Sequence, residues 1–157
     1  MATSFPDGLL NVFVTEIGER GQNKLRIVIA EGIRQPIPAI EFAGLDMGPG
    51  HSIDVTDDSR RFELVWDQYV AYAVRNESFW KPELGQPDMA KHLEQRYDTA
   101  FLQFVSQTTF ADDGYPGPLQ HWTLNTHTHC VDVVSVDPPH LRAIDPTGGF
   151  LITRSES

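Results

Sequence analysis

The chain has 157 residues, 40% of them hydrophobic, and its 22 acidic against 12 basic residues give a formal net charge of -10. Such a length supports a single domain, residues 1–157, with one core, and no run reaches the roughly 18 apolar residues of a membrane helix. The acidity, with no cluster of Lys or Arg, argues against nucleic acid as a partner.

The cysteine usage and the start of the chain bear on location. A single cysteine excludes an internal disulfide and a cysteine-rich zinc site. The first residues, MATSFPDG, lack the basic and apolar regions of a signal peptide. These features predict a cytoplasmic protein.

The first two thirds of the chain read mainly as strands. Two strand-like runs, LLNVFVTEI and KLRIVIAE, flank the turn-forming segment GERGQN, so residues Leu9 to Glu31 are predicted to form a hairpin. Farther along, apolar residues recur at every second position from Phe62 to Val74, with Gln68 as the one interruption. This alternation predicts one long strand.

A helix is expected after the Pro- and Gly-containing segment that follows the long strand. Apolar residues from Met89 to Val105 follow a helical period, and Asp88 stands where an N-cap is favoured. Strands are expected again from Gln120 onward. The order of elements predicts an α+β fold, in which one principal amphipathic helix packs on a mainly antiparallel sheet.

The stretch QHWTLNTHTHCVDVVSVD raises the question of a metal site. His127 and His129 would share one face of a strand, about 7 Å apart at Cα, close enough to bind one ion together. Asp132 has the opposite parity, and no third ligand is evident nearby. The alternative function is therefore a metal-dependent, hydrolase-like enzyme with one divalent transition metal on these histidines. Cys130, next to His129, is interpreted as a buried, inert thiol.

The segment following the long strand suggests a protein-binding surface. Glu77, Phe79, Trp80 and Glu83 place acidic and aromatic side chains together in a Pro- and Gly-containing loop, and Arg75 is expected to hold Glu77. No complete catalytic constellation is recognisable, so no catalytic residue and no cofactor is assigned. The favoured function is a non-catalytic acidic binding protein, of the inhibitor or immunity type, for a basic partner protein.

Three segments carry a resemblance to known sequences. FELVWDQYVAYAVRNESF, YPGPLQHW and HCVDVVSVDPP resemble a family of small uncharacterised bacterial proteins. The resemblance spans roughly residues 59–139 and implies a bacterial, cytoplasmic origin. It brings no activity and no catalytic residue.

Overall fold

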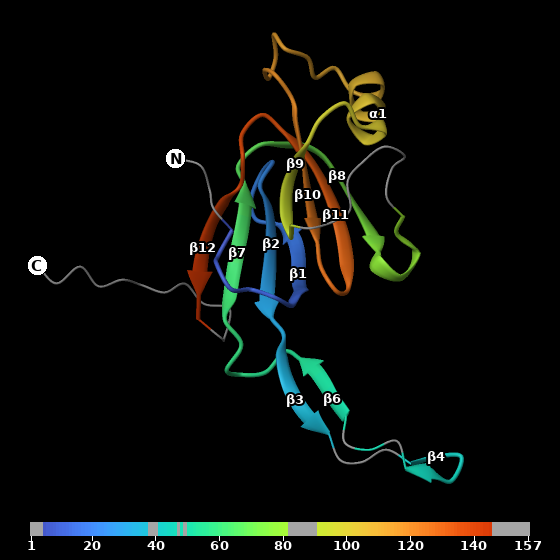
Figure 1. The fold of residues 1–157 in the computed structure, drawn as a ribbon. Coiled ribbons are helices and arrows are strands. Elements are labelled where there is room, and N and C mark those ends of the chain that lie inside the picture. The colour runs from blue at the N-terminus through green and yellow to red at the C-terminus, as the bar shows by residue number, and fades with distance from the viewer. Residues whose placement is uncertain (1–4, 38–40, 47, 49, 82–90, 146–157) are drawn as a thin grey trace, which may run out of the picture.

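The computed structural model describes residues 5–37, 41–46, 48, 50–81 and 91–145, and its main body is a β-sandwich of two antiparallel sheets (Figure 1). The first sheet has the strand order β1 (Val12–Glu19), β2 (Leu25–Glu31), β7 (Arg61–Trp66) and β12 (His140–Ile144). The second sheet has the order β8 (Tyr69–Asn76), β11 (His129–Ser135), β10 (Gln120–Asn125) and β9 (Leu93–Arg96).

Two short ribbons extend from one end of the sandwich as an arm (Figure 1). Strands β3 (Ile33–Ile37) and β6 (Gly50–Asp54) form the first ribbon, and β4 (Glu41–Phe42) and β5 (Leu45–Asp46) form the second. The arm lies at the opposite end of the molecule from α1 (Ala100–Thr108).

The core lies between the two sheets. Because side chains alternate along a strand, every second residue of the inner strands faces the opposite sheet. Ile27 of β2 pairs with Leu64 of β7, and both are fully buried, as is Val133 of β11. Burial of each such side chain stabilises the fold by about 1.5–3 kcal/mol. The buried cluster consists of Leu9, Val12, Val14, Leu25, Ile27, Ile29, Leu64, Trp66, Leu124, Val131 and Val133.

The predicted α+β fold is wrong, because the described chain is largely β and its α-helix is short. The N-terminal part of the expected helix, Leu93–Arg96, is instead strand β9, which pairs with β10. Asp98 then takes a positive φ of 52° that ends the strand, and Thr99 caps the nine-residue α1. The expected cap Asp88 lies outside the described residues. None of the helices in the described segments is long and apolar enough to span a bilayer.

The predicted hairpin from Leu9 to Glu31 is confirmed by the pairing of β1 with β2. The predicted long strand is wrong, because it is two strands in two different sheets. β7 ends at Trp66 and pairs with β2 and β12, whereas β8 begins at Tyr69 and pairs with β11. The break falls at Gln68, where the apolar alternation is interrupted, so the interruption marks the crossing between sheets.

Candidate functional site

A cavity of about 510 Å³ lies between α1 and the outer face of the second sheet. One side is apolar, with Phe101 and Phe104 from α1 and Trp80 from the segment after η1 (Glu77–Phe79). The sheet side is polar. It carries the side chains of Arg75, Arg96, His121, Thr123, Asn125 and Asp132.

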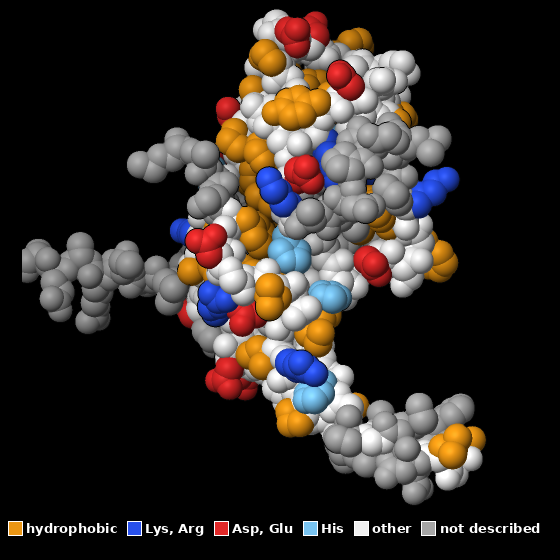
Figure 2. Space-filling view, in the orientation of Figure 1, with side chains coloured by type: hydrophobic (Ala, Val, Ile, Leu, Met, Phe, Trp, Pro, Cys, Tyr) orange, Lys and Arg blue, Asp and Glu red, His pale blue; other side chains and the backbone are white. Residues whose placement is uncertain are grey.

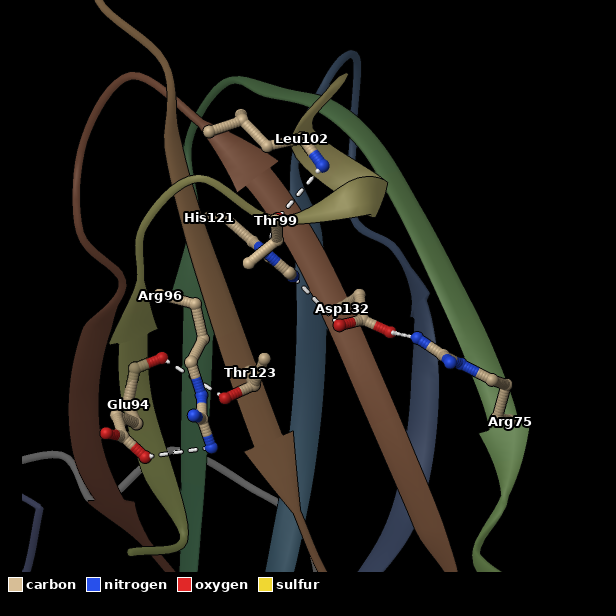
Figure 3. Close-up of polar contacts among 8 residues, drawn as sticks. All are labelled: Arg75, Glu94, Arg96, Thr99, Leu102, His121, Thr123 and Asp132. Atoms are coloured by element: carbon tan, nitrogen blue, oxygen red, sulfur yellow. Dashed lines mark hydrogen bonds and ion pairs between the residues drawn. The ribbon is translucent and has the colours of Figure 1, made fainter. Parts of the chain in front are cut away.

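The polar side is centred on a buried His121–Asp132 pair (Figure 3). His121 Nε2 lies 2.8 Å from Asp132 Oδ1, and the other carboxylate oxygen of Asp132 accepts a hydrogen bond from Arg75 Nη2. The hairpin register explains this meeting, because Thr123 is directly opposite Asp132 and His121 is therefore its diagonal neighbour. His121 and Asp132 are only 3% and 5% exposed.

Thr99 connects this pair to the helix. Its Oγ1 lies 2.7 Å from His121 Nδ1 and accepts a hydrogen bond of 3.1 Å from the backbone N–H of Leu102 (Figure 3). If the proton of His121 is on Nε2, facing Asp132, Nδ1 accepts from the Thr99 hydroxyl.

The order hydroxyl, imidazole and carboxylate is also that of nucleophile–base–carboxylate triads. Here, however, the hydroxyl oxygen is engaged as the N-cap of α1, and Thr99 is only 3% exposed. A nucleophile must reach its substrate, whereas an N-cap needs only the helix. We therefore interpret the chain of contacts as an anchor that fixes the start of α1 over the sheet.

A second polar group borders the cavity on β9. Arg96 Nη2 lies 3.2 Å from Glu94 Oε2, and the Thr123 hydroxyl donates to the backbone oxygen of Glu94 at 3.3 Å (Figure 3). Arg96 is directly opposite His121 in the ladder between β9 and β10. The pairing of β9 with β10 thus fixes the positions of both Arg96 and Glu94.

The electrostatics of the site favour an ionised Asp132. Burial acts to raise the pKa of this carboxyl, but the hydrogen bonds from His121 and Arg75 outweigh burial and hold the pKa below the ordinary value of 3.8. Asp132 is therefore a fixed negative charge whose oxygens are already engaged by these two side chains.

The residues predicted as a partner-binding surface are only partly described. Glu77 and Phe79 belong to η1, and Phe79 is 85% exposed. Trp80 is half-buried and lines the cavity, and Glu83 lies outside the described residues. The ion pair of Arg75 is with Asp132 rather than with the expected Glu77.

The two histidines of the metal hypothesis lie where β10 turns into β11. His127 Nε2 is 2.9 Å from Asn11 Oδ1, and the His127 ring stacks on Phe13 with a centroid distance of 5.2 Å. His129 Nδ1 is 2.8 Å from Thr128 Oγ1. No group of three or more His, Cys, Asp or Glu side chains that could hold a metal occurs in the described parts of the chain. The metal-dependent alternative stays a prediction, and the described residues supply no third ligand for it.

Cys130 is buried, and this burial, with the nearby negative charges of Glu77 and Asp132, raises its pKa from 9.0 to about 11. This rise in the pKa lowers the thiolate fraction at pH 8 about 100-fold, and the thiolate is the reactive form. We expect the native thiol to react with a disulfide reagent at least about 100-fold more slowly than the same thiol in guanidinium chloride. Stopped-flow absorbance at pH 8 measures both rates, and equal rates would contradict the assignment of Cys130 as inert.

A surface rich in exposed aromatic and acidic side chains surrounds α1. Tyr97, Phe104, Phe110 and Tyr115 are 68%, 58%, 102% and 81% exposed. Acidic Asp98, Asp112 and Asp113 are also exposed. We call these seven residues the α1 surface, and Figure 2 shows acidic and hydrophobic side chains gathered over this end of the molecule. The sequence contains no Lys or Arg between Tyr97 and Leu141.

The fold and the site define a β-sandwich that has a cavity between α1 and the second sheet and, next to it, a surface of acidic and aromatic side chains. No family model matches the chain, and neither a curated protein nor a solved structure matches it.

The sequence reasoning missed His121, Asp132, Thr99 and Arg96 as members of one site. A hairpin in which Asn125 pairs with Cys130 places Asp132 opposite Thr123 and therefore diagonally across from His121.

Proposed function

We propose that this protein is a non-catalytic binding protein for a basic partner protein, and that the α1 surface is its main contact area. The observation that carries the proposal is the coincidence of four exposed aromatic rings with three exposed carboxylates in a stretch without Lys or Arg. Aromatic side chains that remain exposed in the free protein are the usual anchors of protein interfaces.

The acidic residues determine the kind of partner. Asp98 directly precedes Thr99, the N-cap of α1, and Asp113 lies in the turn-rich segment after the helix. Neither takes part in an ion pair with the described residues, so both charges face solvent. A partner with clustered Lys and Arg would be attracted by this local field and by the overall charge of -10.

The previously predicted Glu77 and Phe79 fit the same interface as its second part. Phe79 directly precedes Trp80, and Trp80 lines the cavity together with Phe104 of the α1 surface. The two aromatic segments therefore border one cavity, and a partner that covers α1 can contact both.

The test is capture of partners from an extract of the source organism on the immobilised full-length protein, with elution by a salt gradient. We expect a basic protein to be retained at low salt and released as salt screens the charges. The Asp98→Asn, Asp113→Asn variant is expected to retain at least about tenfold less of it.

The matched control is the Asp57→Asn, Asp58→Asn variant, which removes the same charge from an exposed turn far from α1 (Figure 1). Retention by this variant is expected to stay within about twofold of the parent. Equal losses in both variants would mean that only net charge matters, and retention of an acidic protein alone would refute the choice of partner.

A further inference from the structure

The cavity beneath α1 differs in charge from the surface around it. The described side chains that line it include the cations Arg75, Lys81 and Arg96 but a single carboxylate, that of Asp132. This local excess of positive charge lies within a chain whose net charge is -10. This charge does not suit the basic partner proposed for the α1 surface, so any ligand of the cavity should differ from that partner in charge.

Of the three cations among the described lining residues, two are in ion pairs and one is not. Arg75 is paired with Asp132, and Arg96 is paired with Glu94. Lys81, which is exposed at the cavity, takes part in none of the ion pairs among the described residues. Among the described residues of the cavity, the formal charge of Lys81 alone is left unbalanced, and it matches a ligand with one negative charge.

Asn125 supplies an independent sign of a missing ligand atom. It lies on the same face of β10 as His121 and Thr123, lines the cavity and is only 8% exposed. Its Nδ2 has no hydrogen-bond partner within the described structure. A buried amide donor without a partner is costly, and an acceptor oxygen that meets it when the Asn125 amide turns toward the cavity would remove that cost.

The remaining walls indicate the rest of the ligand. Phe101 and Phe104 form a stacked pair with a centroid distance of 6.4 Å, and Trp80 lines the same cavity. Aromatic walls and a volume of about 510 Å³ are typical of sites for metabolite-sized molecules.

We propose that this cavity binds a small organic monocarboxylate with an aromatic or aliphatic body. The carboxylate pairs with Lys81 and accepts from Asn125 Nδ2, and the apolar body packs against Trp80, Phe101 and Phe104. Asp132 does not repel this anion strongly, because its own oxygens are held by Arg75 and His121.

NMR titration of the full chain tests the proposal with benzoate, 3-phenylpropionate, indole-3-acetate and octanoate, each beside its neutral amide. At least one carboxylate is expected to saturate with a Kd below about 1 mM and to shift the side-chain amide signal of Asn125 and the indole signal of Trp80. Its amide is expected to bind at least about tenfold more weakly, because it lacks the charge that pairs with Lys81.

Two variants test whether Lys81 is the cation that binds the carboxylate. Lys81→Met is expected to weaken carboxylate binding at least about fivefold. Lys24→Met removes an equal charge from the turn between β1 and β2, where Lys24 pairs with Asp67, and should leave the affinity within about twofold.

Three results would overturn the proposal: no carboxylate saturates, the amides bind equally well, or the shifts map away from the cavity. Inorganic phosphate serves as an additional competitor, and tighter binding of phosphate than of any carboxylate would also overturn it. The site does not depend on the basic partner, because none of these measurements involves the acidic residues of the α1 surface.

Discussion

Glu63→Ala is expected to lower the free energy of unfolding by about 3–5 kcal/mol, because it leaves the buried Arg26 guanidinium without its nearest counter-charge. Glu63 of β7 is 1% exposed, and its carboxylate accepts from Arg26 Nε at 2.6 Å and from Arg142 Nε. Arg26 is itself only 6% exposed, and the variant leaves it with Glu16 alone, at 3.0 Å. Guanidinium chloride unfolding followed by tryptophan fluorescence measures the loss.

Glu31→Ala is the control for this effect. Glu31 also binds an arginine, with Arg60 Nε at 2.5 Å, but the Arg60 side chain is half exposed. Water replaces the lost partner at such a site, so the expected cost is about 0–1 kcal/mol. If Glu63→Ala and Glu31→Ala cost the same, burial is not what makes the Glu63 cluster important.

Asp132→Asn is expected to lower the free energy of unfolding by about 3 kcal/mol at pH 7. The substitution removes the charge that the Arg75 guanidinium binds, and it alters the acceptor at His121 Nε2. Because His121 also contacts the Thr99 cap, part of the loss should come from looser packing of α1. Amide hydrogen exchange is expected to show this as faster exchange of Leu102, whose N–H Thr99 caps.

The stability difference between the parent and Asp132→Asn depends on pH in a defined direction. Burial acts to raise the pKa of Asp132, but the hydrogen bonds from His121 and Arg75 outweigh burial and lower it below 3.8. The ionised carboxylate therefore stabilises the folded state fully above the unfolded pKa of 3.8, and this contribution is lost as the pH falls through the folded pKa.

The gap between the parent and Asp132→Asn should thus be largest at neutral pH and shrink below pH 3.8. Unfolding curves at several acidic and neutral pH values measure the gap. The pKa of Glu63 is also lowered, but Glu63 is present in both proteins and cancels in the comparison. A gap that widens toward acid would contradict the assigned charge of Asp132.

Local sequence patterns predicted the parts of the fold that depend on neighbours in the chain. The β1–β2 hairpin follows from two alternating runs around a turn. The division into two sheets could not be predicted in this way, because the apolar pattern continues on both sides of Gln68 although the chain passes from one sheet to the other there. Leu93 and Tyr97 satisfy a helical spacing, but Leu93 pairs with Leu124 in the sheet and Tyr97 is exposed. Tertiary pairing thus overrides the helical period here.

The candidate site could be predicted less well than the fold. His121 and Asp132 are eleven positions apart, and only the register of the hairpin brings them to 2.8 Å. His127 and His129, which the sequence suggested as a metal-binding pair, instead lie at the turn. There His127 contacts Asn11 and His129 contacts Thr128. Aromatic residues after α1 were not singled out, because their exposure depends on where the helix ends.

The central claim is that the α1 surface contacts a basic protein, and site-specific photo-crosslinking tests it most directly. A photoreactive phenylalanine analogue is placed at Phe110 of the α1 surface or at Leu45, which is 66% exposed at the far end of the arm (Figure 1). Irradiation in the extract should join a basic protein to position 110 and leave position 45 without that adduct. The absence of an adduct at 110, or the same adducts at both positions, would contradict the claim.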